Sequence, residues 1–108
     1  MVIETVRFRL HEGVSRDDFQ RAVDESTRYL ETCNGFVNRV TGFNEDGECF
    51  DLVIWETAED GLRVWEVFDT ALENRAFVAA IAETTVDMKH FDLVHQTETR
   101  NENPVSRK

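Results

Sequence analysis

Apolar and polar residues alternate at the start of the chain, which is the period of a β-strand with one buried face. Val2, Glu4, Val6, Phe8 and Leu10 occupy every second position, and all of them are apolar except Glu4. Polar residues dominate the positions between them. The pattern therefore predicts a first strand that carries one carboxylate on its apolar face.

The next segment has apolar residues every three or four positions, which is the spacing of a helix that buries one face. Ser15 precedes Asp18 by three positions and predicts an N-cap, whose hydroxyl accepts a hydrogen bond from a free amide. Asn34-Gly35 tolerates the left-handed conformation that ends many helices. The residues expected to face the core are Phe19, Ala22, Val23, Ser26, Leu30 and Cys33.

Two strands are predicted at residues 36–43 and 49–55, joined by a polar hairpin that contains Asp46-Gly47. Thr57 and Asp60 repeat the capping pattern, so a second helix is expected to follow. The buried face of this helix is expected to comprise Leu62, Trp65, Phe68 and Leu72.

Asn74-Arg75 interrupts the apolar spacing, which predicts a break before a shorter helical piece. That piece is expected to carry Phe77, Ala80 and Ile81, and residues 86–95 are expected to form the last strand. We expect one domain at residues 1–96. Residues 97–108 are polar and are expected to form a mobile C-terminal tail.

The order strand, helix, strand, strand, helix, strand predicts an α+β protein with the ferredoxin-like βαββαβ arrangement, in which both helices cover one face of a four-stranded antiparallel sheet. The third strand has apolar residues on both faces: Leu52 and Ile54 on one, Val53 and Trp55 on the other. Two helices cover only one face. We therefore expect a homodimer in which two sheets pack together as a dimeric α+β barrel.

Charge and composition exclude several classes of partner. The formal net charge is −10, which disfavours nucleic acid because phosphate recognition requires a positive surface. Neither a membrane span nor a secretory signal is indicated, so we expect a cytoplasmic protein. Cys33 and Cys49 lack the paired spacing of a metal site and are expected to be free thiols.

Several segments together resemble the antibiotic-biosynthesis monooxygenase-like proteins of the dimeric α+β barrel superfamily. The matching segments are "VIETVRFRLHEG", "NGFVNRVTGF", "VIWET" followed by "VWEVF", and "VDMKHFDLV", which together span residues 2–95. The resemblance implies the same fold. Members of this group include cofactor-free oxygenases, haem-degrading enzymes, isomerases and proteins without a known reaction, so the resemblance does not select one activity.

The haem-degrading branch of these proteins has an asparagine on the first strand and a histidine near the end of the second helix. Matching by position places Val6 and Ile81 there, whereas Trp65 approximately matches the tryptophan of that branch. The resemblance therefore implies that haem binds weakly or not at all. No glycine-rich phosphate loop is present either, so no cofactor is expected.

Two interpretations of the tryptophans remain open. Trp55 and Trp65 are of the type that fills cores. They can also line a pocket between the second helix and the sheet, which is where the resembling enzymes hold flat organic substrates. The residues expected to line such a hydrophobic ligand pocket are Val6, Trp55, Trp65, Phe68, Phe77 and Ile81.

Glu4, His90 and Asp92 are the candidate catalytic residues. The first and last strands are neighbours in this fold, so Glu4 is expected near Asp92 and diagonally near His90. A carboxylate beside a histidine can form an acid/base pair, because it orients the imidazole and favours the protonated form. A purely structural pair is the alternative. The spacing of these residues does not require a metal.

The sequence thus favours a small homodimer that binds a hydrophobic or aromatic small molecule and acts as a cofactor-independent monooxygenase. A non-catalytic ligand-binding or stress-responsive dimer of the same fold is the alternative. The sequence does not identify the substrate.

Overall fold

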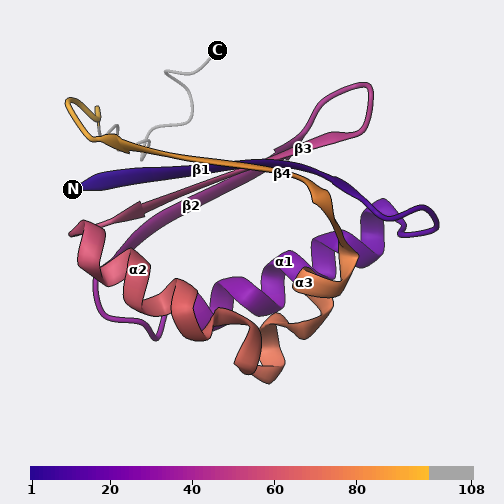
Figure 1. Cartoon of the computed structure of the whole chain (residues 1–108), viewed down its shortest axis with the longest axis horizontal. Coiled ribbons are helices and arrows are strands. Elements are labelled where there is room, and N and C mark those ends of the chain that lie inside the picture. The colour runs from indigo at the N-terminus through magenta and orange to yellow at the C-terminus, as the bar shows by residue number, and fades with distance from the viewer. Residues whose placement is uncertain (98–108) are drawn as a thin grey trace, which may run out of the picture.

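The computed structural model describes residues 1–97 and has the predicted ferredoxin-like architecture. Its helices lie together below a four-stranded antiparallel sheet whose order is β2-β3-β1-β4 (Figure 1). The elements are β1 Val2–Leu10, α1 Arg16–Leu30, β2 Phe36–Phe43, β3 Glu48–Trp55, α2 Ala58–Val67, the short 3₁₀ turns η1 Phe68–Thr70 and η2 Leu72–Asn74, α3 Arg75–Ala80, and β4 Ile81–Asp92. Nearly all of the predicted tail, residues 98–108, lies outside the described residues.

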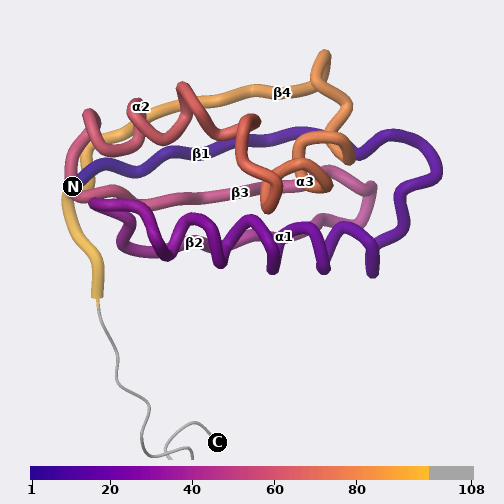
Figure 2. The backbone as a smooth tube through the Cα atoms, turned by 90° about the horizontal axis from the view of Figure 1, so that it is seen from below, coloured from indigo at the N-terminus to yellow at the C-terminus, as the bar shows by residue number. Residues whose placement is uncertain are grey.

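Both long helices begin at the predicted caps. The Ser15 hydroxyl accepts a hydrogen bond from the Asp18 amide at 3.0 Å, and the Thr57 hydroxyl accepts one from the Asp60 amide at 3.1 Å. These bonds satisfy amides that lack an intrahelical partner. Figure 2 views the molecule from the helix side, with α1 running along β2 and α2 lying toward β4.

The first helix buries the predicted face, but the second is rotated relative to the prediction. The buried residues of α1 are Phe19, Ala22, Val23, Ser26 and Leu30. In α2 the buried residues are Gly61 and Val64, whereas Leu62 is 60% exposed. Of the predicted face, Phe68 is buried directly after the helix and Trp65 packs partly buried against the core. Leu72, also predicted to be buried, is 71% exposed because the helix ends at Val67 and the turns that follow break its periodicity.

Gly61 explains this rotation of α2. A Cβ placed on Gly61 would lie 2.9 Å from Cδ1 of Trp55, closer than real Cβ contacts allow. The missing side chain therefore lets the helix backbone rest on the indole ring. Leu62, the next residue, then points away from the sheet.

The last strand begins earlier than predicted. Ile81 is the first residue of β4 and pairs with Leu10, so its assignment to the preceding helix was wrong. The strand ends at Asp92 rather than at residue 95. Pairing with β1 continues to the end of β1 through a register shift between Arg7 and Arg9. Thr85 lies within this shift, and its hydroxyl accepts a hydrogen bond from the Arg9 amide at 2.9 Å.

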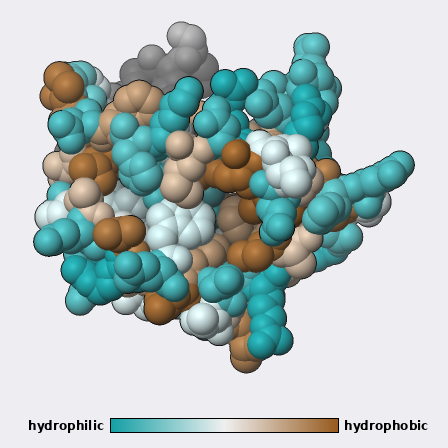
Figure 3. All heavy atoms as spheres, in the orientation of Figure 1, coloured by the Kyte–Doolittle hydropathy of each residue, from teal (hydrophilic) through white to brown (hydrophobic). Residues whose placement is uncertain are grey.

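The two faces of the sheet differ in cover. The helix-covered face holds a core that includes Val6, Phe8, Phe19 and Phe77, all less than 10% exposed. On the opposite face, Ile3 lies between Ile54 and Phe91 in the register, and Phe91 is 50% exposed. Figure 3 shows apolar side chains reaching the surface between polar ones in the Figure 1 orientation. Phe50 and Val40 are further exposed apolar residues of the helix-free face.

Candidate functional site

Glu4 lies at the centre of a cluster of nitrogen donors. Its side chain comes from β1, and the residue is only 2% exposed. Oε1 accepts a hydrogen bond from Nε1 of Trp55 at 3.1 Å, and Oε2 accepts one from Nε1 of Trp65. Oε2 also lies 3.3 Å from Nε2 of His90. Four elements, β1, β3, α2 and β4, thus converge on one carboxylate.

The sheet register explains this convergence. Glu4 pairs directly with His90 on β4 and with Val53 on β3, while Val2 pairs with Trp55. Residues at alternate positions of paired strands share a face, so these side chains all point toward the helices. Trp65 completes the cluster from α2. Gly61, one helical turn before Trp65, has no side chain and so lets the helix approach Trp55 closely.

His90 connects the buried carboxylate to solvent. Its side chain is 57% exposed, whereas that of Glu4 is 3% exposed. An ionised carboxylate only accepts hydrogen bonds, so this contact is a hydrogen bond in the tautomer whose Nε2 carries the proton. In the neutral ring the other nitrogen, Nδ1, is then the acceptor. This arrangement gives an oriented imidazole that can receive a proton at Nδ1.

Asp92 does not occupy its predicted position. We expected it opposite Glu4, with His90 on the diagonal, but the register places His90 opposite Glu4 and Asp92 opposite Val2. Asp92 is an exposed residue at the end of β4. The prediction had the correct strands and the correct face, and it was wrong by two residues in register. The cluster around Glu4 therefore contains His90 and two indoles.

Two hollows meet at this cluster. The inner cavity lies between the sheet and the helices and has a volume of about 20 Å³. The outer groove lies between α2 and β4, with a volume of about 420 Å³, and its own lining includes Leu62, Met88 and His90. Four residues, Glu4, Trp55, Gly61 and Trp65, line both. The groove falls in the size range of small-molecule sites, whereas the cavity is far below it.

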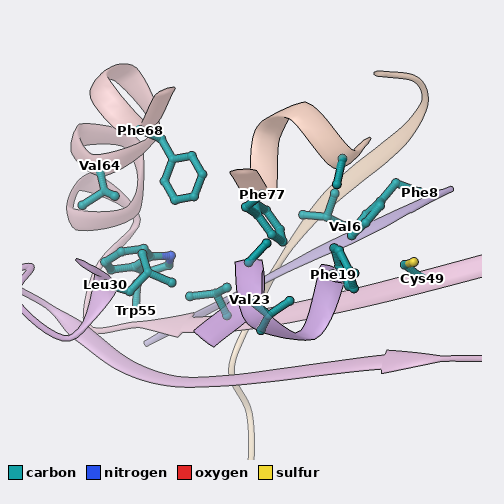
Figure 4. Close-up of a cluster of buried hydrophobic side chains, with 13 residues drawn as sticks. Val6, Phe8, Phe19, Val23, Leu30, Cys49, Trp55, Val64, Phe68 and Phe77 are labelled. Carbon is teal, nitrogen blue, oxygen red and sulfur yellow. The ribbon is translucent and has the colours of Figure 1, made fainter. Parts of the chain in front are cut away.

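The predicted pocket residues divide into two groups. Val6, Trp55, Trp65, Phe68 and Phe77 line the inner cavity, and Ile81 does not. Ile81 pairs with Leu10 at the other end of β1. Figure 4 shows Trp55, Val64 and Phe68 together, with Val6 and Phe77 farther along the core. The tryptophans are therefore both core residues and the wall of a hollow.

Sequence reasoning missed a second buried acid on the same face of the sheet. Asp51 accepts hydrogen bonds from Nε of Arg39 at 3.0 Å and from its NH2 group at 2.9 Å, and both side chains are less than 10% exposed. The NH1 group of Arg39 donates to the hydroxyls of Ser26 and Thr27 at 2.6 and 2.9 Å. The alternation of inward and outward residues along β3 could have revealed it, because Asp51 lies between Cys49 and Val53 on the inward face.

Two further ionisable groups differ from their ordinary behaviour. Burial raises the pKa of the Cys49 thiol to about 11, so this cysteine is protonated and unreactive at neutral pH. Hydrogen bonds from Thr57 and Arg63 lower the pKa of Asp60. Within residues 1–97, no group of three His, Cys, Asp or Glu side chains is placed to hold a metal ion. None of the helices described there is long and apolar enough to cross a bilayer.

Comparison with known proteins identifies the fold through structure alone. A scan against protein-family models gives no match, and a search of curated proteins gives none either. Solved structures do match. The cofactor-independent oxygenase SnoaB from Streptomyces nogalater superposes with a TM-score of 0.70 at 17% identity, covering 89% of this chain and 94% of that one.

Two other solved structures extend this comparison. A candidate antibiotic biosynthesis monooxygenase from Bordetella bronchiseptica has a TM-score of 0.73 at 15% identity, covering 87% of this chain and 97% of that one. A dimeric ferredoxin-like protein from an uncultured marine organism has a TM-score of 0.60 at 7% identity, covering 92% of each chain. The chain therefore has the fold of these proteins over nearly its whole described length.

Proposed function

We propose that this protein is a homodimer that binds a hydrophobic aromatic molecule and acts on it as a cofactor-independent monooxygenase. The observation that carries the proposal is the Glu4–His90 pair at the wall of the apolar groove between α2 and β4. A buried carboxylate that holds a half-exposed imidazole provides a base directed at a bound molecule. The fold of SnoaB, a cofactor-independent oxygenase, supports the same class of reaction.

In this proposal the substrate is a phenol whose hydroxyl proton moves to Nδ1 of His90. Glu4 stabilises the imidazolium that forms. The phenolate gives up electrons to dioxygen, a C–O bond forms at the ring carbon opposite the hydroxyl, the O–O bond breaks, and the hydrogen at that carbon leaves as a proton. A phenol and O₂ thereby yield a quinone and water, with one atom of O₂ in each product. Dioxygen is the oxidant and the substrate supplies every electron.

The homodimer rests on the helix-free face of the sheet. Val40, Phe50 and Phe91 are 53, 38 and 50% exposed there, which is unfavourable for apolar side chains in water. A second copy packed sheet to sheet would cover them, and one structural neighbour is described as dimeric. Light scattering at micromolar concentration should give twice the 12.5 kDa of a single chain. A particle of 12.5 kDa would contradict the dimer.

Oxygen uptake with a panel of phenols and naphthols that carry hydrogen at the carbon opposite the hydroxyl tests the reaction. We expect His90→Ala to lower uptake by about 10²-fold or more, since a positioned base contributes rate enhancements of that order. Asp92→Asn is the matched control on the same strand and should retain full uptake. Unchanged turnover in His90→Ala would remove the base from the proposal.

A non-catalytic ligand-binding dimer is the second candidate. All three hydrogen-bond partners named for the Glu4 carboxylate are side chains of the protein itself, as expected of a structural pair. Calorimetry separates the two candidates. Binding of a naphthol without oxygen uptake, at an affinity that His90→Ala leaves unchanged, would favour the non-catalytic protein.

A further inference from the structure

We infer that the inner cavity is a binding compartment for dioxygen, separate from the groove that takes the organic molecule. This inference rests on the proposed function, because an oxygenase without a cofactor must hold O₂ next to its substrate. The cavity is lined by buried apolar side chains from six elements, together with the shared Glu4 cluster and the Arg39–Asp51 pair. The apolar lining consists of Val6, Leu30, Val53, Val64, Phe68 and Phe77.

The size of the cavity selects its occupant. A volume of about 20 Å³ accepts one molecule of the size of water or a diatomic gas. An aromatic substrate needs a hollow of roughly 300 Å³ or more. The groove, at about 420 Å³, meets that requirement and the cavity does not.

The polarity of the cavity favours a gas over water. A buried water needs two to four polar partners, and apolar cavities stay dry. The polar side chains of the lining already have protein partners: Glu4 faces three N–H donors, and Asp51 is paired with Arg39. In the described residues, the one buried side-chain polar atom without a partner is Oδ1 of Asn74, which is not part of the lining.

The position of the cavity suits the reaction. Glu4, Trp55, Gly61 and Trp65 line both hollows, so a gas molecule that leaves the cavity passes one layer of side chains before it reaches a molecule in the groove and reacts there. The Glu4–His90 pair lies at the same wall. Dioxygen, the substrate and the base would therefore meet around one carboxylate.

Methyl NMR under oxygen pressure tests this assignment with O₂ itself as the probe. Dissolved O₂ is paramagnetic and enhances the relaxation of nuclei that it contacts, with argon at the same pressure as the reference. We expect the methyl groups of Leu30, Val53 and Val64 to show several-fold larger enhancement than that of Ile54. Ile54 is the matched control because it is equally buried, at 5% exposure, but does not line the cavity.

Two filling variants sharpen the test. Val53→Leu and Val64→Leu each add one methylene to the cavity, from β3 and from α2 respectively. Either should abolish the preferential enhancement and raise the KM for oxygen several-fold, with the Kd of a naphthol unchanged. Using both variants guards against one of them failing to fold, and Ile54→Leu, on the other face of the sheet, controls for a buried substitution away from the cavity.

The outcomes separate this inference from the proposed function. Preferential enhancement at the cavity that either filled variant abolishes supports the dioxygen compartment, even if no phenol in the panel is turned over. Equal enhancement at the cavity methyls and at Ile54 overturns it, even if oxygen uptake is observed. An unchanged KM for oxygen in both folded variants of an active protein also overturns it.

Discussion

The two buried acids on the helix-covered face of the sheet are held in different ways. Asp51 is paired with the full charge of Arg39, and both side chains are less than 10% exposed. Glu4 is held by two neutral indoles and by an imidazole that is 57% exposed. Asp51 is buried together with its counter-charge, whereas the histidine partner of Glu4 is exposed and can contact a ligand. A closed pair stabilises the fold, and an open pair can exchange protons.

The largest expected effect is at the closed pair. Asp51→Asn leaves the Arg39 charge buried without a counter-charge, which should lower the free energy of unfolding by about 3–5 kcal/mol. His90→Ala at the open pair should change it by less than about 0.5 kcal/mol, because exposed side chains contribute little. Urea denaturation measures both. Equal losses would show that the two acids do not differ in the way described above.

A double replacement checks the cause of that loss. Arg39→Met combined with Asp51→Leu removes both charges and should recover much of the stability lost in Asp51→Asn, since well-packed apolar residues often replace a buried ion pair without cost. A double variant as unstable as Asp51→Asn would mean that the loss comes from packing.

The next largest effect is expected at the contact between Gly61 of α2 and the indole of Trp55. Gly61→Ala places a Cβ 2.9 Å from Cδ1 of Trp55 and should cost about 1–3 kcal/mol through overpacking. It should also weaken ligand binding in the groove, because α2 moves. Gly42→Ala is the control, since a Cβ there meets no atom within 4 Å. Thermal melts compare the stability of the Gly61→Ala and Gly42→Ala variants, and calorimetry compares their ligand binding. Equal stability of the two variants would contradict the close contact between Gly61 and Trp55.

A smaller effect is expected from the neutral donors. Trp65→Phe keeps an aromatic ring and removes the N–H that Glu4 accepts, which should cost about 0.5–1.5 kcal/mol. The Asp51–Arg39 pair is unaffected, so the Asp51→Asn loss should add to it. Strong non-additivity in the double variant would show that the two acids are coupled.

The smallest effect is expected at Asp60, a partly buried acid at the start of α2. The pKa of Asp60 is lowered by hydrogen bonds from Thr57 and by Arg63. A lowered folded-state pKa gives stability that is present above the unfolded-state pKa and is lost as pH falls through the folded-state pKa. Asp60→Asn should therefore narrow the difference in stability between neutral and acidic pH. Parallel plots of unfolding free energy against pH for the unmodified protein and the Asp60→Asn variant would contradict this.

The sequence predicted the fold because periodicity and capping depend on local spacing. The inward face of α1 followed from residues such as Phe19 and Leu30, and the caps at Ser15 and Thr57 followed from their spacing to Asp18 and Asp60. The face of α2 could not be predicted in this way, because Gly61 sets it through a contact with Trp55, six residues earlier on another element.

The candidate site was predicted in part for a similar reason. Alternation placed Glu4 and His90 on neighbouring strands and on one face, but the pairing register depends on the whole length of β4, so Asp92 was assigned two residues from its place. Arg39 was missed because its charge is recognisable as buried only when Asp51, Ser26 and Thr27 surround it.

Glu4 accepts hydrogen bonds from both tryptophans of the chain. All tryptophan fluorescence from a folded subunit therefore comes from two indoles that contact the same carboxylate. No tryptophan elsewhere in the chain adds background to that signal. The intensity and wavelength of that emission report directly on whether the Glu4 cluster is intact. Stopped-flow fluorescence of the unmodified protein can thus follow the arrival of a ligand in the groove, without a dye.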